Sequence, residues 1–376
     1  MVNFKKKLRS KKKNKFKINT SILISIKNRP LYTIRALRYL ESINCKYPII
    51  IGDGSDKNKM LSKFFDIKNL KNLKIKYFYN GSDKNYYSFF KKNLKILKLV
   101  KTKYCLFIPD DDFYNLKLLA KMENILDLNE DISCINGITE KFVIYDNNYK
   151  KSKLLKIAGQ SHCIGKQYKK SELSSYKDVI SRLRKAKSTR IFDSFHRTKN
   201  LKFIYKFCVI NKFNNFIYLC LVKEFVTNFL GKTTLINKLF CLKQANTQHN
   251  HGIITKNEKK DNLKHFRNFK KIFIIKLYEA LSKKNKIKRI DNFKYKVLKS
   301  FNTSIDENIQ DHKKQLNHFD NVIWICKNFI IGQIKKINIL KYSYFFFKNL
   351  FFIKEFNNGF YKIIHDFLIE YEKKYF

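Results

Sequence analysis

Short apolar runs alternate with longer segments of helical spacing from Thr20 onward. The short runs predict buried β-strands, and the longer segments predict amphipathic α-helices. The predicted strands are 21–26, 48–51, 73–78 and 104–109, and the predicted helices are 31–43, 86–100 and 116–128. Strands that alternate with helices are typical of a parallel, doubly wound α/β sheet, which is the fold class we expect.

Polar and charged residues follow three of the predicted strands directly. The first strand runs into Lys27-Asn28-Arg29-Pro30, the second into Gly52-Asp53-Gly54-Ser55-Asp56, and the fourth into Asp110-Asp111-Asp112. Pro30 suits the first turn of a helix, whose free N–H groups can face an anion. Because ligands of doubly wound sheets bind at the carboxyl ends of the strands, these three segments are the candidate site.

The two acidic clusters have a structural and a functional interpretation. Asp is a good turn and N-cap residue, and for Asp53 this interpretation stays open. One Asp suffices for a cap, however, and three in a row are unexpected in a chain with 30 acidic residues among 376. Neighbouring carboxylates repel one another unless a cation lies between them. A divalent ion, Mg or Mn, with a diphosphate as its remaining ligand fits residues 110–112. Asp53 can accept a hydrogen bond from a base or a ribose hydroxyl.

The segments SILISIKNRP, PIIIGDGSDK and YCLFIPDDDFY resemble bacterial glycosyltransferases of the GT-A fold, close to family 2. Those enzymes have a strand ending near NRP, a second ending in DDGS, and a DxD motif. The resemblance covers about residues 20–252. It implies a Rossmann-like, mostly parallel sheet flanked by helices, a nucleotide-sugar donor, and Mg or Mn as cofactor. The second motif here has a single acid, Asp53, which leaves the choice of base open.

The resemblance also implies roles for individual residues. Asp53 lies at the base or ribose, Asp110 toward the ribose, and Asp112 toward the metal and diphosphate. The implied donor-binding residues are Asn28, Arg29, Asp53, Asp110 and Asp111, and the implied metal ligands include Asp110 and Asp112.

The acceptor half of the site is expected further along the chain. Residues 132–145 alternate as one or two more strands do, and the segments 181–184 and 192–197 resemble acceptor-side segments of the same group. In an inverting transferase a carboxylate takes the proton of the attacking hydroxyl. Glu224, which resembles a later acid of such enzymes, is the first candidate and Asp193 the second. A surface or capping role is the alternative for both.

Two other motifs are weaker indications of a site. Gly231-Lys232-Thr233-Thr234 resembles the end of a phosphate-binding loop, but Val226 stands where that loop needs its first glycine, so we reject it. His249, in Gln248-His249-Asn250-His251, is a further candidate metal ligand, with a polar turn as the alternative.

The net charge is +50, from 80 Lys plus Arg against 30 Asp plus Glu. Only 10 of the basic residues are Arg, and Lys, Asn, Ile, Phe and Tyr are the residues of A/T-rich codons. The charge attracts anions whatever its origin. A nucleic-acid binder relies more on Arg, so nucleic acid is not the partner we expect. The composition excludes an acidic disordered tail and a small disulfide scaffold.

The chain divides by composition into a basic arm (1–19), a GT-A-like domain (20–252) and a Lys- and aromatic-rich helical extension (253–376). The arm lacks the apolar region of a secretory signal, and the eight cysteines form no CxxC pair. No segment is apolar enough to span a membrane. We expect a cytoplasmic protein. The extension either packs on the domain or contacts the inner membrane face peripherally.

The sequence thus predicts a hexosyltransferase-type enzyme that moves a sugar from a nucleotide donor to a glycan or lipid-linked acceptor in cell-surface polysaccharide synthesis. A nucleotidyltransferase is one alternative, but it calls for a Gly-rich loop after the first strand, where residues 27–30 have no glycine. A non-enzymatic basic protein that binds nucleic acid or membrane is the other. Its binding affinity would fall steeply as the salt concentration rises and would not depend on the Asp residues.

Overall fold

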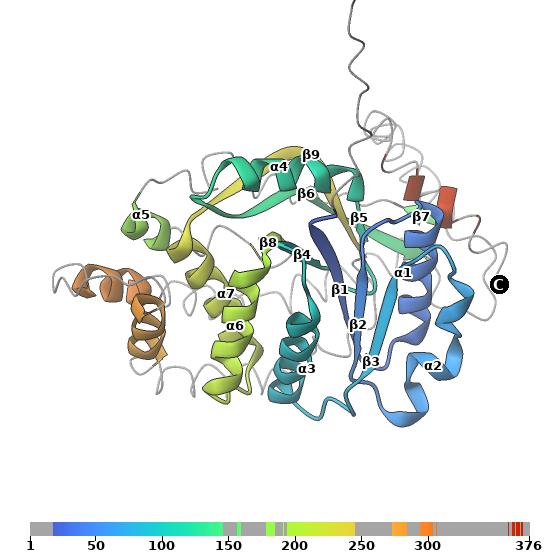
Figure 1. Ribbon diagram of the computed structural model, residues 1–376, viewed down its shortest axis with the longest axis horizontal. Helices are drawn as coiled ribbons and strands as arrows, with labels where there is room; N and C mark the ends of the chain where they lie inside the picture. The colour runs from blue at the N-terminus through green and yellow to red at the C-terminus, as the bar shows by residue number, and fades with distance from the viewer. Residues whose placement is uncertain are drawn as a thin grey trace, which may run out of the picture.

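A computed structural model describes the chain over residues 18–145, 156–158, 178–184, 191, 194–244, 273–283, 294–303, 306, 360, 363–364, 366–368 and 370. Residues 1–17 of the predicted basic arm (1–19), Asp193 and His249 lie outside the described residues. The described residues form a nine-stranded sheet flanked by helices (Figure 1). Its elements are β1 Thr20–Ile26, α1 Pro30–Ser42, β2 Ile49–Asp53, η1 Lys57–Lys59, α2 Leu61–Phe64, η2 Ile67–Asn69, β3 Ile75–Tyr79, α3 Tyr86–Leu99, β4 Tyr104–Phe107, β5 Phe113–Tyr114, η3 Leu116–Leu118, α4 Leu119–Leu128, β6 Ile132–Tyr145, β7 Lys156–Ala158, α5 Val179–Arg184, β8 Phe195–Arg197, α6 Thr198–Ile210, α7 Phe216–Leu230 and β9 Lys232–Gln244.

The described strands lie in the order β3-β2-β1-β4-β8-β6-β9-β5, and β7 pairs with β6 beside this path. β3, β2, β1 and β4 are mutually parallel, β8 is antiparallel to both of its neighbours, and β6 and β9 are again parallel. Asp53, the last residue of β2, pairs with Ile26 of β1 and Tyr79 of β3. The carboxyl ends of these strands therefore meet at one edge, as the sequence predicts.

The expected α/β class, a mostly parallel sheet flanked by helices, is confirmed. Each predicted strand and helix of the first third is present within a few residues of its expected limits. Residues 132–145, predicted as one or two strands, form the single strand β6. The rejected phosphate-binding loop at Gly231 is not one, since Lys232 begins β9 rather than a helix.

Two apolar layers hold the sheet between its helices. Ile22, Ile24 and Ile26 of β1 pack with α1 and α4, whereas Leu23 points to the other face and packs with α3, α6 and α7. This alternation follows from the period of two along a strand. Figure 1 shows α1 and α2 beside β1–β3, and α3 and α6 across the sheet from them.

The described C-terminal segments belong to these same layers. Phe273, Leu277 and Phe301 are buried with α6 and α7, and Phe367 packs edge to face on Tyr39 of α1, with ring centroids 5.5 Å apart. These residues therefore pack on the α/β core, which is the first of the two interpretations of the extension. The predicted domain limits stay a prediction.

The described cysteines behave as small apolar residues. Of those described, all but Cys220 are buried. Cys105 of β4 and Cys134 of β6 flank His196 of β8 in register across three neighbouring strands. Burial raises the pKa of the Cys105 thiol to about 11 and lowers the pKa of His196 well below its usual value. These groups are therefore neutral at pH 7 and fill the interior.

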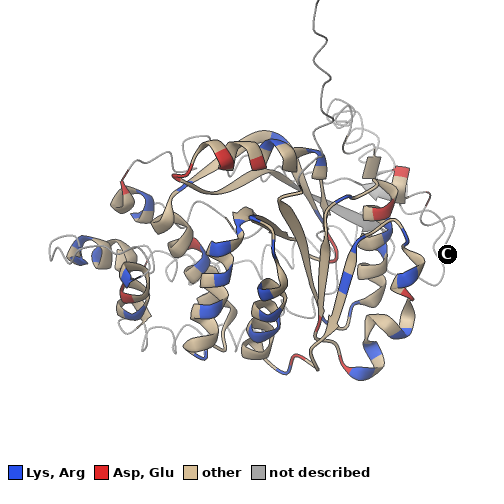
Figure 2. Cartoon of the chain, in the orientation of Figure 1, with Lys and Arg blue, Asp and Glu red and all other residues tan. Residues whose placement is uncertain are grey.

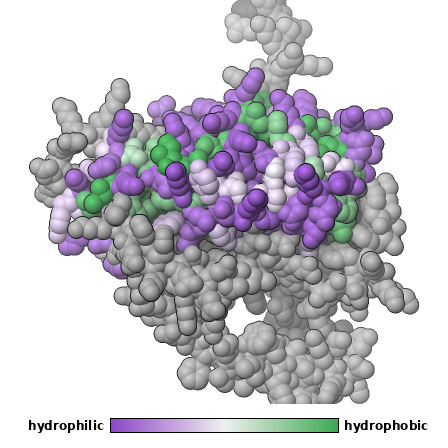
Figure 3. All heavy atoms as spheres, turned by 90° about the horizontal axis from the view of Figure 1, so that it is seen from below, coloured by the Kyte–Doolittle hydropathy of each residue, from purple (hydrophilic) through white to green (hydrophobic). Residues whose placement is uncertain are grey.

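Lys and Arg are spread over the surface of the described fold rather than gathered on one element (Figure 2). Seen from below, the described surface is mainly hydrophilic, with small hydrophobic areas between (Figure 3). The exposed large apolar side chains, such as Leu128 and Ile210, come from different elements. Within the described ranges, every helix is too short or too polar to cross a membrane.

Candidate functional site

Asn28 joins the loops that follow β1 and β2. Its backbone has a φ of 56°, in the left-handed region that Asn adopts more readily than most residues. Its N–H donates to Ser55 Oγ at 2.7 Å. Its side-chain Nδ2 donates to Asp56 Oδ2, and its Oδ1 accepts from the Asp56 N–H, both at 2.8 Å. Hydrogen bonds to the Asp56 carboxylate from Ser82 and from Asn28 Nδ2 lower the pKa of Asp56. The strand ends predicted to form the site are thus tied together.

Asp53 is fully buried, and both of its carboxylate oxygens have partners inside the protein. Oδ1 accepts from the Ser55 N–H at 2.8 Å, and Oδ2 accepts from the Leu61 N–H at 3.0 Å and the Tyr77 hydroxyl at 2.7 Å. The capping interpretation left open by the sequence is therefore what Asp53 does in the folded chain. Its contact with a donor base or ribose stays a prediction.

The acidic run after β4 is paired with Arg29, which precedes α1. Arg29 Nη1 lies 3.0 Å from Asp110 Oδ1, and Nη2 lies 2.7 Å from Asp111 Oδ2. The guanidinium also lies over the Tyr32 ring, 4.3 Å from its centroid. Arg29 and two of the predicted acids, which are about 80 residues apart in the chain, thus form one bridged cluster.

Asp112 points to a different partner. Its Oδ1 accepts from the N–H of Gln244, the last residue of β9, at 3.2 Å. Arg35 of α1 donates from Nη2 to Gln244 Oε1 at 2.7 Å and to the Asp111 carbonyl at 3.3 Å. The acidic run is therefore fixed between α1 on one side and the end of β9 on the other.

The cluster has little contact with solvent. The side chains of Asp110, Asp111 and Arg29 are 6%, 9% and 11% exposed. Burial raises the pKa of Asp110, and Asp111 adds to this, while Arg29 opposes it. Burial lowers the pKa of Arg29, but the attraction of both acids outweighs this effect and the net shift is upward. Asp110 Oδ2 is buried without a hydrogen-bond partner among the described residues.

These residues fit a divalent cation in part. Among the described residues, no three His, Cys, Asp or Glu side chains are placed together as a metal centre. Asp110 and Asp111 nevertheless converge on one cationic group, and the unpartnered Asp110 Oδ2 is a hard oxygen ligand of the kind that Mg and Mn prefer. Two carboxylates can hold such an ion when phosphate oxygens complete its coordination.

A buried ion pair beside this edge was not anticipated from the sequence. Lys92 of α3 donates to Asp83 Oδ2 at 2.5 Å and to the Ile26 carbonyl at 2.8 Å, and both side chains are 3% exposed or less. Burial raises the pKa of Asp83 and lowers that of Lys92, while their mutual attraction opposes both shifts. The pair anchors the loop after β3 to the end of β1. The sequence evidence for this ion pair was a Lys, residue 92, at a helix position that faces the sheet.

Gly54 makes room for this ion pair. A Cβ at Gly54 would lie 2.1 Å from Asp83 Oδ2, and the Asp83 N–H donates to the Gly54 carbonyl at 2.7 Å. Gly54 is thus required because the next loop of the chain approaches it closely.

Glu224 lies in the middle of α7 and is half-buried. Its neighbour Lys223 is buried and acts electrostatically on Cys105 and His196, at the start of β4 and in β8. This part of α7 therefore packs along the sheet, whereas the acids follow the ends of the strands. The role of Glu224 as a base stays a prediction, and so do those of Asp193 and His249.

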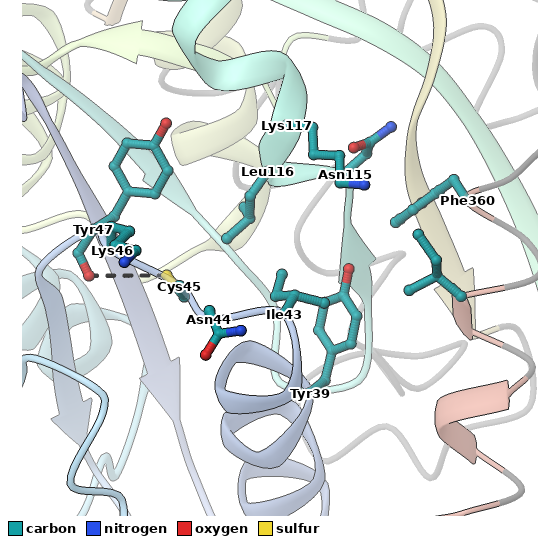
Figure 4. A pocket seen from close by; sticks show the side chains of 11 residues that line it. Tyr39, Ile43, Asn44, Cys45, Lys46, Tyr47, Asn115, Leu116, Lys117 and Phe360 are labelled. Atoms are coloured by element: carbon teal, nitrogen blue, oxygen red, sulfur yellow. Dashed lines mark hydrogen bonds between the residues drawn. The ribbon is translucent and has the colours of Figure 1, made fainter. Parts of the chain in front are cut away.

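A small pocket of about 170 Å³ is lined by none of the acids (Figure 4). It is formed by the C-terminal end of α1, the residues after β5, and Phe360. Lys46 and Lys117 are the charged residues of its lining, and the remaining side chains are apolar, aromatic or amide. None of the residues predicted to bind the donor or the metal lines it.

Comparison with known proteins finds no matching family model and no matching curated protein. Among solved structures, S. aureus TarS 1-349 in complex with UDP-GlcNAc is 12% identical and has a TM-score of 0.43, over 76% of this chain and 71% of that chain. A longer S. aureus TarS is 12% identical with a TM-score of 0.40, over 75% and 55%. TarS 1-349 in complex with UDP is 11% identical with a TM-score of 0.39, over 80% and 93%. Similarity this low does not show a shared family.

Proposed function

We propose that this chain is a glycosyltransferase that binds a nucleotide-diphosphate sugar at the carboxyl ends of β1–β4. The observation that carries the proposal is the buried run Asp110–Asp112 beside the loops after β1 and β2, with two of its carboxylates directed at one cation. Ligands of such sheets bind at this edge. A nucleotide sugar presents a diphosphate, a ribose and a base, which these groups can bind.

Each segment of the edge has a separate task in this proposal. Asn28 and Asp53 hold the loops that border the base and ribose. Arg29 and the free N–H groups at the start of α1 face the diphosphate. Mg or Mn, held by Asp110 and Asp111 rather than by the Asp110 and Asp112 pair that the resemblance implies, would neutralise the charge that develops on the departing nucleoside diphosphate. The buried setting strengthens these electrostatic interactions, because water screens them less.

The acceptor is a glycan or a lipid-linked sugar in cell-surface polysaccharide synthesis, and the reaction inverts the anomeric centre. A carboxylate must then accept the proton of the attacking hydroxyl. Glu224 is the first candidate and Asp193 the second. A cytoplasmic site of action, at the inner membrane face if the acceptor is a lipid, completes the proposal.

The donor class can be tested by the thermal unfolding midpoint of the full chain with UDP-, GDP-, CMP- and dTDP-sugars, each with and without Mn²⁺. A ligand that binds only the folded state raises this midpoint. We expect one nucleotide class to raise it, and to raise it further when Mn²⁺ is present. No shift with any nucleotide sugar, together with salt-sensitive binding to RNA or anionic vesicles, would instead indicate a non-enzymatic basic protein.

A further inference from the structure

We propose that Arg29 is the resident cation of the acid cluster, and that a divalent metal binds only by displacing its guanidinium from Asp110 and Asp111. This inference rests on the proposed function. It goes beyond that function by assigning to one residue control over when the metal enters.

The geometry of the cluster carries the inference. Arg29 bonds the two acids separately, through Nη1 to Asp110 at 3.0 Å and through Nη2 to Asp111 at 2.7 Å. Asp110 Oδ1 and Asp111 Oδ2, two of the oxygens that would ligate a metal, are therefore occupied by one planar, permanently charged group. Asp110 Oδ2 is left buried without a described partner, so one ligand position next to Arg29 is already formed.

Metal and guanidinium exclude each other for electrostatic reasons. A divalent ion on the same two carboxylates would repel the guanidinium, in a setting where burial weakens screening. Charge-assisted hydrogen bonds to both acids would also have to break. Arg35 lies on the other side of the acidic run, where it bonds the Asp111 carbonyl and Gln244, and its charge also acts on Asp110.

Once displaced from the acids, the Arg29 side chain can bind the donor diphosphate of the proposed reaction. Arg29 precedes the first turn of α1, whose N–H groups face the same edge, and its long side chain rests on the Tyr32 ring. A guanidinium bonds phosphate as well as it bonds carboxylate. The donor diphosphate therefore binds Arg29 while the metal binds the acids. Each ligand thus favours the binding of the other.

The test is the binding of Mn²⁺ alone to the full chain, measured by electron paramagnetic resonance of the free ion without any nucleotide. Arg29→Gln is expected to bind Mn²⁺ about tenfold more tightly than the unaltered protein. This factor corresponds to the free energy of about one charge-assisted hydrogen bond, which no longer has to break when the metal binds. Arg38→Gln is the matched control, because Arg38 lies on α1 and pairs with Glu41, and it should leave the affinity unchanged. Adding Asp110→Asn to Arg29→Gln should abolish the gain.

An unchanged or weaker Mn²⁺ affinity in Arg29→Gln would overturn the inference, and so would absence of Mn²⁺ binding to both proteins. Circular dichroism checks that the variant is folded. If it is not, Arg29→Lys replaces it, and its affinity should also exceed that of the unaltered protein because Lys cannot bond both acids bidentately. Failure of the proposed function is distinguishable, since it appears as the absence of a nucleotide-sugar shift in the unaltered protein.

Discussion

Asp110→Asn is expected to lower the rate of sugar transfer on the order of 10²- to 10³-fold, with the fold intact. The substitution keeps the shape of the side chain but removes one of the charges that converge on Arg29. Loss of one group aimed at developing charge in a buried site has effects of about this size. The rate is measured with the donor that raises the unfolding midpoint, and the fold is checked by circular dichroism.

The matched control for this variant is Glu130→Gln. Glu130 is an exposed acid in the turn before β6, at the opposite edge of the sheet from Asp110, and its loss removes the same unit of charge from the protein. Its transfer rate should equal that of the unaltered enzyme. A rate in Asp110→Asn as high as in Glu130→Gln would remove the acid cluster from the mechanism.

Lys92→Met is expected to reduce the free energy of unfolding by about 3 kcal/mol, because it leaves the Asp83 carboxylate buried without its cation. The side chains of this pair are 1% and 3% exposed, so water cannot take the place of the missing partner. Chemical denaturation of the variant and of the unaltered protein measures the difference directly.

An exposed ion pair provides the comparison. Lys103 pairs with Asp127 with side chains 55% and 38% exposed, so Lys103→Met should cost less than about 1 kcal/mol. Adding Asp83→Asn to Lys92→Met should recover part of the loss, as coupling within a pair requires. Equal costs for Lys92→Met and Lys103→Met would contradict the structural role assigned to the buried pair.

The parallel half of the sheet could be predicted from sequence because each element is specified locally. The runs that become β1, β2 and β4 are mostly apolar, and the helices between them keep a regular period. β5 and β8 have only two and three residues, and their partners are distant strands. Pairing between short, distant strands leaves no local sequence pattern, so the antiparallel strands β5 and β8 could not be predicted.

The candidate site, too, could be predicted from the sequence only in part. The acids after β2 and β4 stand out by position, and the topology brings them to one edge as expected. Which groups neutralise them depends on contacts between distant loops. The bridge from Arg29 to Asp110 and Asp111, and the bond from Tyr77 to Asp53, are of this kind and have no sequence pattern of their own.

The central claim is that the edge formed by the carboxyl ends of β1–β4 binds the donor. A crystal structure of the protein soaked with Mn²⁺ and the nucleoside diphosphate of the preferred donor tests this most directly. The account predicts difference density for the diphosphate beside Asp110–Asp112, with the base against the loop after β2. Well-defined density for the nucleotide at any other place on the protein, with this edge empty, would contradict it.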